Sequence, residues 1–415
     1  MACPDMMNGL PMDPLPTNTQ RTAVEAPVVH YLQQAWETAS QLRASDLHFE
    51  PYENNYRVRL RVDGVLQEIP PPPFEYKDQI ASRIKVLAKL DIAEKRLPQD
   101  GRMSVGLRNS KRLNLRVSTL PTLFGEKLVV RVLATDLAQL HLTHLGYGPQ
   151  DKQRMLDAIQ KTQGLILVTG PTGSGKSQSL YACLHHLNRP EINIATVEDP
   201  SEIQLNGVNQ VNVKELIGLN FASSLKAFLR QDPDVLMVGE IRDAETADIA
   251  IKASQTGHLV LSTLHTHDAV GAIIRLRNMG VAAYNLAASI SLISAQRLIR
   301  RLCLHCRKPL HVSQTALQQL GFQKSFKDLS FEPTFFSAQG CPQCHKGYWG
   351  RIGLFEVMPM SANLRQLVLQ NASHTSLQTL AAKEGVHTLR HAGLMQAAMG
   401  ITSVSEVLAQ TDSTV

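Results

Sequence analysis

The sequence predicts an α/β protein whose main domain is built on a parallel, doubly wound sheet and is preceded by a smaller α+β domain. A glycine-rich loop at 170–177 stands between a short apolar stretch and a helical pattern. Apolar stretches then alternate with helical patterns to about residue 300, whereas strands, helices and hairpin turns are mixed before residue 136. The 415 residues allow about two or three domains with sizeable cores.

The composition is that of a globular protein, with 43% hydrophobic and 19% charged residues. The net charge of +6 permits contact with an acidic partner or an anionic membrane surface, but an ordinary solvated surface is the better explanation. We find no apolar run long enough to span a bilayer, and no basic segment followed by an apolar core at the N-terminus. A cytoplasmic location is therefore expected.

Residues 1–24 are predicted to be disordered, because prolines interrupt a polar segment that has no periodicity. Residues 25–136 are predicted to form the α+β domain. Its expected elements are a helix over 27–42, an edge-type strand over 44–51, a strand over 56–62 ending at a turn at 63–64, a helix over 78–90, a turn at 100–101, and a hairpin of strands over 112–118 and 127–133.

The rest of the chain is predicted to continue from a linker into the main domain and two smaller parts. The expected boundaries are a linker over 137–149, the core over 150–301, a tetracysteine metal-binding subdomain over 302–348 and a helical subdomain over 349–415.

The glycine-rich loop reads Gly-x-x-x-x-Gly-Lys-Ser, the phosphate-binding P-loop. Its residues are Gly170, Pro171, Thr172, Gly173, Ser174, Gly175, Lys176 and Ser177. Glycines let backbone N–H groups turn toward phosphate oxygens, Lys176 can reach the β- and γ-phosphates, and the Ser177 hydroxyl can bind Mg²⁺. A glycine-rich turn that binds nothing would leave the Lys-Ser pair at a helix start unexplained. ATP and Mg²⁺ are therefore the expected ligands.

Two further strands are each followed by acidic residues, where the ligand crevice of a parallel sheet lies. The strand at 192–197 leads into an acidic box at 198–202, and the strand at 234–238 leads into Gly239-Glu240. Because Glu240 stands where many P-loop enzymes carry a magnesium-binding Asp, we expect Ser177, phosphates and waters to hold Mg²⁺. Glu240 could then orient or deprotonate the attacking water. The alternative role, capping the next helix, suits Asp243.

A third strand, within 257–266, has His258 before it and His265 after it. A polar side chain at a strand end beside the γ-phosphate can sense it by hydrogen bonding. A structural hydrogen bond is an equally good explanation for either histidine.

Four cysteines form two C-x-x-C pairs, Cys303 with Cys306 and Cys341 with Cys344. Four thiolates suit a closed tetrahedral Zn²⁺ site with bonds of about 2.3 Å. Four free thiols, or one redox pair, would not account for two such motifs in a reducing compartment. Neighbouring histidines are expected to be bystanders.

The segment Leu229-Arg230-Gln231-Asp232-Pro233-Asp234, followed by Gly239-Glu240-Ile241-Arg242-Asp243, resembles the signature of the type II secretion and type IV pilus assembly ATPases. The resemblance extends over nearly the whole chain from about residue 25. Further similar segments lie at 43–51, 99–102, 116–121 and 347–357.

The resemblance implies a RecA-like core, a PAS-like N-terminal domain and a homohexamer. It assigns Glu202 to the acidic box, Glu240 to the Walker B position, and His258 and His265 to a histidine box. It also implies that Arg116 and Arg131, on the two hairpin strands, reach a nucleotide across a subunit boundary. From the residues alone, these arginines would be read as a solvated strand face.

The function implied is a cytoplasmic ATPase, peripheral at the inner membrane through its partners, that drives assembly of pilin or pseudopilin fibres through an inner-membrane platform protein. The tetracysteine loop favours assembly or export over retraction. Ser201 departs from the family pattern, and the short segment before the first helix leaves docking by a further N-terminal domain in doubt. One alternative is a DNA-uptake or conjugation-type motor, although no aromatic-interleaved basic groove is evident and no specific nucleic acid is expected. Another is a non-hydrolysing structural ring.

Overall fold

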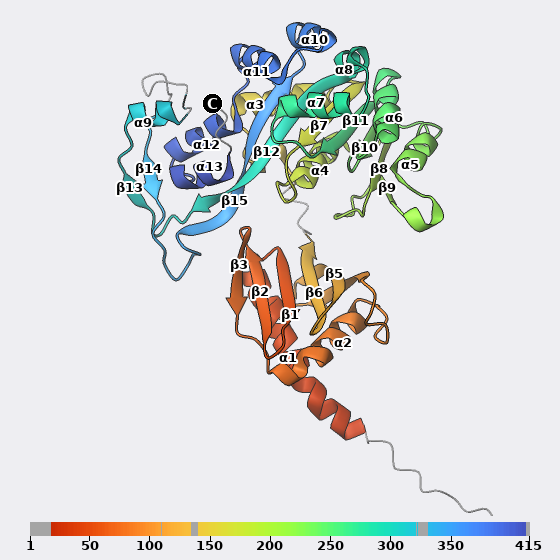
Figure 1. The fold of residues 1–415 in the computed structure, drawn as a ribbon, viewed down its shortest axis with the longest axis vertical. Coiled ribbons are helices and arrows are strands. Elements are labelled where there is room, and N and C mark those ends of the chain that lie inside the picture. Colours follow the sequence, from red (N-terminus) through yellow and green to blue (C-terminus); the bar gives the residue numbers. More distant parts are fainter. Residues whose placement is uncertain (1–17, 109, 134–139, 321, 323–330, 412–415) are drawn as a thin grey trace, which may run out of the picture. The chain divides into compact units, whose positions relative to one another are not determined.

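The computed structural model describes residues 18–108, 110–133, 140–320, 322 and 331–411. The chain divides into two compact units, Met1–Thr135 and Asp136–Val415, each with its own hydrophobic core (Figure 1). Among the described helices, none has both the length and the apolar character needed to cross a membrane.

The first unit is an antiparallel sheet covered on one face by two helices. The described strands run in the order β3-β2-β1-β6-β5-β4. Their bounds are β1 Asp46–Pro51, β2 Tyr56–Val62, β3 Val65–Ile69, β4 Gln99–Gly106, β5 Arg112–Thr122 and β6 Gly125–Leu133. Helices α1 (Asn18–Gln41) and α2 (Lys77–Leu87) bury apolar side chains such as Trp36 and Ile84 against Phe49 and Leu60.

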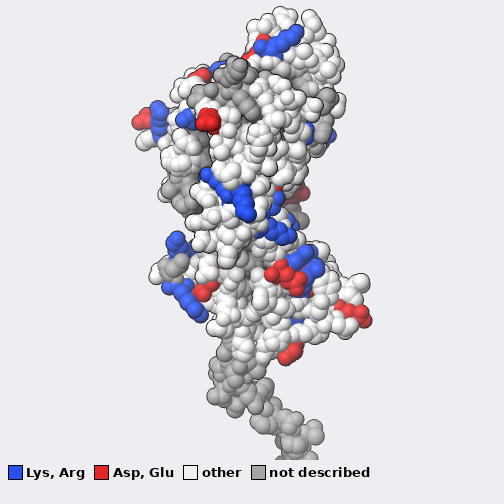
Figure 2. Space-filling view, turned by 90° about the vertical axis from the view of Figure 1, so that its left-hand side faces the viewer, with Lys and Arg blue, Asp and Glu red and all other residues white. Residues whose placement is uncertain are grey.

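Strand β2 shows why the opposite face of this sheet is basic. Its residues alternate between buried and half-buried, so Val58 and Leu60 face the core while Arg57, Arg59 and Arg61 lie on the other face. Lys and Arg also gather in patches, with Asp and Glu among them, on the molecular face drawn in Figure 2.

Three expectations for this unit differ from the structure. Strand β1 is central, between β2 and β6, rather than an edge strand. Pro51 lies beyond the residues that pair with β6, Asp46 to Phe49, so on that side the strand loses no hydrogen bond to the missing N–H. Asp100-Gly101 lies inside β4 rather than in a turn, because the two residues pair with Ser118 and Val117 of β5. Glycine is needed at position 101 because a Cβ there would lie 2.7 Å from the Ala88 carbonyl.

Helix α1 begins at Asn18, nine residues before the expected start, with Pro27 inside it. Helix-forming residues such as Gln20, Arg21, Ala23 and Glu25 precede the proline and extend the helix backwards. Residues 18–24 are thus helical, and residues 1–17 of the segment predicted to be disordered lie outside the described residues.

The second unit is a three-layer α/β structure. Its large sheet has the strand order β15-β12-β7-β11-β10-β8-β9, in which the pairs are parallel except for antiparallel β12–β15. The bounds are β7 Gly164–Thr169, β8 Ile194–Glu198, β9 Asn209–Asn212, β10 Val235–Val238, β11 Leu259–Leu264, β12 Ile290–Leu302 and β15 Tyr348–Pro359.

Helices cover both faces of this sheet (Figure 1). α3 (Pro149–Ile159) and α4 (Lys176–Leu187) pack in one apolar cluster, and further helices, among them the four that follow along the chain, pack in the other. These four are α5 Phe221–Phe228, α6 Ala244–Gln255, α7 Ala269–Asn278 and α8 Ala283–Ser289. The expected linker contains a 3-10 turn, η3 (Leu142–His144), and its residues 137–139 lie outside the described part.

The strand β15 corrects the expected order of the last third of the chain. Residues 349–359 were expected to open a helical subdomain, but they pair along β12 and complete the core sheet. The short strands β13 (Lys308–Leu310) and β14 (Phe335–Ser337) pair beside the cysteines, with α9 (Gln314–Gln319) between them in sequence. The chain then continues as α10 Ala362–Leu369, α11 His374–Lys383, α12 Leu389–Ala398 and α13 Val404–Gln410.

Candidate functional site

The P-loop has the strand–loop–helix setting that its sequence predicts. It leaves β7 at Thr169 and enters α4 at Lys176, and Gly170, Gly173 and Gly175 all have positive φ. A side chain at Gly170 would come within 2.5 Å of the Gln296 carbonyl and 2.6 Å of the Ser174 hydroxyl. The loop is therefore held tightly against β12, in a conformation that requires glycine.

The Lys176 ammonium lies over the loop as a cation without a counter-ion. Its Nζ donates to the carbonyl oxygens of Gly170, at 2.8 Å, and Pro171, at 3.1 Å, and it forms no ion pair with any described residue. Burial is the main reason why the pKa of Lys176 is lowered to about 8; the Glu240 carboxylate opposes this shift and Arg297 adds to it. A partly desolvated cation in this position has much to gain from an anionic ligand.

Gln296 and Arg297 of β12 also belong to this site, and the sequence analysis missed both. The Gln296 amide donates to the Ser174 carbonyl at 2.8 Å and accepts from the Ser179 hydroxyl at 2.8 Å. Arg297 is 8% exposed and donates to the His267 carbonyl. The available signal was a pair of large polar residues in the middle of the strand-like segment Ile290–Leu302, with apolar residues directly before and after the pair.

Glu240 lies directly beyond β10, at the carboxyl edge of the sheet. One of its oxygens pairs with Arg242, which also reaches Asp199 at 3.3 Å, and the other lies 3.2 Å from Nε2 of His265. The ends of β8, β10 and β11 are thereby linked through polar side chains. Because a carboxylate has about four acceptor positions, Glu240 can still accept a hydrogen bond from a water.

Hydrogen bonds also connect the end of β11 to the start of the P-loop. The backbone N–H of Thr266 donates to the Thr169 hydroxyl at 2.9 Å, and the two threonine hydroxyls are 2.6 Å apart. His265 is therefore held on the edge of the sheet from which the P-loop departs. The predicted cap is confirmed as well: the Asp243 side chain accepts from the N–H of Thr246 at 2.8 Å at the start of α6.

The acidic box divides into a structural and an exposed part. Glu198 is buried and accepts hydrogen bonds from Tyr181, from Thr196 at 2.7 Å and from Gln210 at 3.1 Å. Glu202 is exposed, and its backbone N–H donates to the Tyr181 hydroxyl at 3.0 Å. The catalytic role expected for Glu202 stays a prediction.

The structure does not bring His258 to this edge. His258 precedes β11, and its Nδ1 lies 3.0 Å from the Ala253 carbonyl at the end of α6. The seven residues from His258 to His265 span about 23 Å in an extended chain, at about 3.3 Å per residue. Within this unit, the two expected sensor histidines thus lie at opposite ends of one strand, and only His265 contacts Glu240.

Arg116 and Arg131 are directly opposite each other on β5 and β6 of the first unit. Arg131 donates to the buried Asp46 carboxylate at 2.9 Å, and Arg61 lies 3.9 Å from the other oxygen of Asp46. Arg116 pairs with Asp100 at 3.3 Å, and Arg102 is its partner residue on β4. The two expected arginines are therefore part of a basic row across the exposed face of the sheet.

The four cysteines of the two pairs converge, with their sulfur atoms all within 4.8 Å of one another. The Sγ–Sγ distances are 3.8 Å for Cys303–Cys341, 3.7 Å for Cys306–Cys344 and 3.6 Å for Cys341–Cys344. A regular tetrahedron with bonds of about 2.3 Å requires separations of about 3.8 Å. The donor set and its dimensions therefore fit Zn²⁺.

Comparison with known proteins adds the following. A family model described as "Type II/IV secretion system protein" matches residues 21–409. The type IV pilus assembly ATPase PilB of Acinetobacter baylyi is 50% identical over 385 residues, which cover 92% of this chain and 66% of that protein. PilB of Pseudomonas aeruginosa is 48% identical, with coverage of 97% and 71%. Type II secretion system protein E of Pseudomonas aeruginosa is 45% identical, with coverage of 93% and 76%. The chain spans about two thirds of the length of these pilus relatives.

Two solved structures share the fold. The Legionella pneumophila ATPase DotB aligns with a TM-score of 0.66 at 20% identity, covering 92% of this chain and 94% of that one. The pilus retraction motor PilT with bound ADP aligns with a TM-score of 0.60 at 24% identity, covering 91% and 96%.

Proposed function

Because this chain belongs to the family of type II/IV secretion system proteins, we propose that it is an ATPase whose ATP hydrolysis powers assembly of pilin or pseudopilin fibres. The observation that carries the proposal is Lys176, a desolvated cation without an ion pair among the described residues, set in a glycine loop on the same sheet edge as Glu240. Pilus relatives match at higher identity than the secretion relative, which favours pilin as the substrate.

The residues of the loop fit a magnesium-bound nucleotide. Backbone N–H groups from Gly173 to Lys176 and the ammonium of Lys176 would hold the phosphates, and the hydroxyl of Ser177 would bind Mg²⁺. The metal supplies neutralisation of charge on the transferring phosphoryl group. Glu202, which is exposed, keeps its proposed role as the second carboxylate of the site, whereas Glu198 is occupied by its three hydrogen-bond donors.

Glu240 is proposed to orient the attacking water. Arg242 and His265 fix the two oxygens of its carboxylate, so that the remaining acceptor positions have defined directions. A carboxylate held in this way does not have to reorient during the reaction, so little free energy is needed to align the water with the γ-phosphate. His265 would report the presence of the γ-phosphate through its contact with Glu240.

Arg116 and Arg131 are proposed to act on the nucleotide of a neighbouring copy in a homohexamer. Their exposure supports this: the Arg116 side chain is 37% exposed and that of Arg131 is 55% exposed, so both guanidinium groups are available to an external partner. Arginines supplied in this way are worth about 10³–10⁵ in rate in other P-loop enzymes. The proposal further places the protein at the inner membrane through platform and machinery proteins.

The tetracysteine cluster is proposed to hold a structural Zn²⁺. All four ligands come from the protein, as in closed sites that stabilise folding rather than perform chemistry. The bound metal would tie the turn after β12 to the loop before β15.

The test is steady-state ATP hydrolysis by the assembled protein. We expect turnover in the parent chain and its loss in Lys176→Ala. A suitable control is Lys226→Ala, which removes an exposed lysine paired only with Glu245 on α6 and should leave turnover unchanged. Absence of turnover in a correctly assembled parent protein would remove the enzymatic proposal and leave a structural ring.

The contribution of the arginines is tested by mixing two inactive variants. Arg131→Ala supplies an intact P-loop, and Lys176→Ala supplies an intact arginine. If the arginines act on a neighbouring copy, mixed assemblies recover part of the parent activity. Recovery will be absent if Arg131 acts within its own chain.

A further inference from the structure

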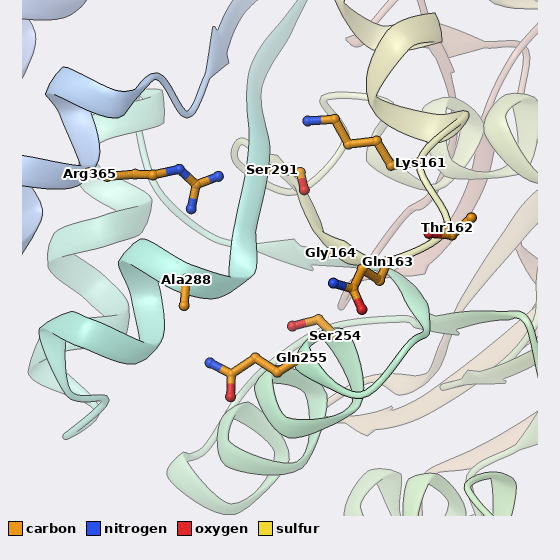
Figure 3. A pocket seen from close by; sticks show the side chains of 9 residues that line it. All are labelled: Lys161, Thr162, Gln163, Gly164, Ser254, Gln255, Ala288, Ser291 and Arg365. Atoms are coloured by element: carbon orange, nitrogen blue, oxygen red, sulfur yellow. The ribbon is translucent and has the colours of Figure 1, made fainter.

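Away from the P-loop site, a cavity lies in the second unit at the amino edge of the large sheet, which is the edge opposite to the P-loop. Its volume is about 630 Å³, within the range of ligand-binding pockets. It is lined by Lys161, Thr162, Gln163, Gly164, Ser254, Gln255, Ala288, Ser291 and Arg365 (Figure 3). Gly164 is the first residue of β7 and Ser291 is the second residue of β12, so the pocket opens where these two strands begin.

The pocket has two cations and no acidic residue among its lining residues. In Figure 3 the Arg365 and Lys161 side chains enter it from different sides and point toward Ser291. Neither cation forms an ion pair with any described residue. Arg365 comes from α10 and donates through its two terminal nitrogens to the carbonyls of Ala287 and, at 3.1 Å, Ile290. A guanidinium has five N–H donors, so three remain for another acceptor.

Partial burial makes Arg365 more than a surface charge. Desolvation lowers the pKa of Arg365, and no carboxylate among the described residues compensates for the loss of water. Ser291 adds an independent observation. The residue as a whole is only 8% exposed, and its hydroxyl forms no hydrogen bond with the described residues. Because Ser291 lines the cavity, this hydroxyl can donate to a bound ligand.

The surrounding helices limit the charge of the ligand. α3, α6 and α8 all end beside the pocket, and each carboxyl end carries at most about half a negative charge. The three helix ends therefore offset most of the charge of the two cations, and the net positive charge at the pocket is small. Polyphosphates prefer helix N-termini and their N–H groups, which this edge does not offer. A singly charged, planar carboxylate fits the free N–H groups of an arginine better.

We propose that this pocket binds a carboxylate group, held by Arg365 and Lys161 with a hydrogen bond from Ser291. The carboxylate belongs either to a small organic acid or to a glutamate or aspartate side chain of a polypeptide. Binding at this edge is separate from the nucleotide chemistry, because β7 and β12 run between the two sites. The proposal therefore does not depend on the proposed ATPase activity.

Equilibrium dialysis of the full chain with labelled probes tests the proposal. Excess MgADP is included to occupy the P-loop. The probes are propionate, the blocked peptide acetyl-Gly-Glu-Gly-amide and inorganic phosphate. We expect propionate or the peptide to bind more tightly than phosphate, and the tighter of the two identifies the source of the carboxylate. Tighter binding of phosphate, or no saturable binding of either carboxylate probe, overturns the proposal.

Variants connect the binding to the pocket. Arg365→Gln should weaken carboxylate binding by at least about tenfold, because a charged hydrogen-bond donor is lost. Lys161→Gln should weaken it by about two- to fivefold, as expected for an exposed ion pair. Since Arg365 also binds two carbonyls of the α8 end, Lys161→Gln provides the test if Arg365→Gln fails to fold. Lys383→Gln, an exposed lysine at the end of α11, is the control and should bind like the parent. Equal losses in Lys161→Gln and Lys383→Gln would contradict the assignment.

Discussion

Gln296 offers the sharpest test of how the P-loop is held, and Gln296→Leu is the informative change. Leucine is similar in size but can neither donate to the Ser174 carbonyl nor accept from the Ser179 hydroxyl. Gln296, Ser174 and Ser179 are each at most 3% exposed, so water cannot replace the lost partner. Each buried polar group left unsatisfied costs about 1–3 kcal/mol, which gives about 2–6 kcal/mol in total.

Part of this cost will appear as lower stability and part as a disordered P-loop. We expect the Kd of a non-hydrolysable MgATP analogue, measured by isothermal titration calorimetry, to rise at least about tenfold, which corresponds to 1.4 kcal/mol. The melting temperature should fall as well.

Gln396→Leu is the matched control for this experiment. Gln396 on α12 is also nearly buried, and its amide donates to the Gly353 carbonyl at 3.0 Å and the Gly146 carbonyl at 3.4 Å. We expect it to lower the melting temperature and leave the Kd of the nucleotide unchanged. An unchanged Kd in Gln296→Leu, or equal changes of Kd in the two variants, would refute the role assigned to Gln296.

Four further outcomes are expected. Because the pKa of Lys176 is about 8 and bound phosphates favour its ammonium form, nucleotide affinity measured by titration should fall about tenfold per pH unit above pH 8; a flat profile to pH 9.5 would contradict this. Burial raises the pKa of Glu356 to about 7. The contribution of Glu356 to stability is therefore present below its unfolded pKa of about 4.3 and is lost as the pH rises through 7. In urea unfolding, the free energy of unfolding of Glu356→Gln should rise by about 2–3 kcal/mol relative to that of the parent between pH 5 and pH 8, and a constant difference would argue against it. Cys341→Ser should lower the melting temperature and reduce the zinc content measured by elemental analysis, and an unchanged content would exclude the tetracysteine site. Asp46→Asn should release Arg131 and lower ATP turnover with little change in nucleotide affinity. Glu50→Gln should instead affect stability more than turnover, because this equally buried carboxylate pairs with Arg57, Arg59 and Lys127.

The parts of the fold that could be predicted are those with a strong local signal. Strands β7, β10 and β11 are runs of four to six consecutive buried residues bounded by turns or helices, and apolar runs of this short length are typical of buried parallel strands. Glu240 and His265 could be placed because they follow two of these strands. The P-loop needs only one contiguous motif.

Long-range packing decided the parts that could not be predicted. Nothing local in residues 348–359 indicates that they pair with β12 and extend the core sheet, since that pairing depends on a strand nearly 50 residues earlier. Asp100-Gly101 carries a turn signal, but its pairing with a strand that begins more than ten residues later places it in β4. Gln296 and Arg297 escaped notice because a polar residue within a strand has no meaning until its neighbours are known.

His258 illustrates a limit of predicting a strand's surroundings from its sequence. The two ends of β11 look equivalent in the sequence, because a histidine stands next to each. A parallel sheet makes them different, because only the carboxyl ends of the strands face the P-loop. The arginines Arg116 and Arg131 illustrate the reverse case: their alternation identifies an exposed strand face, and only the family resemblance suggests a catalytic partner for it.

A single-turnover measurement on Glu240→Gln addresses the central claim, that the edge formed by the P-loop and Glu240 hydrolyses ATP. Glutamine keeps the size of the side chain and can still accept from His265, but it loses the negative charge that pairs with Arg242. The assembled variant is mixed with less than one equivalent of MgATP, and the formation of ADP is followed by rapid quenching. The account predicts that nucleotide binds with an affinity within about threefold of the parent, while the rate of hydrolysis falls by about 10²–10⁴, the usual contribution of a positioned base. Hydrolysis at the parent rate in a variant that binds nucleotide normally would contradict it.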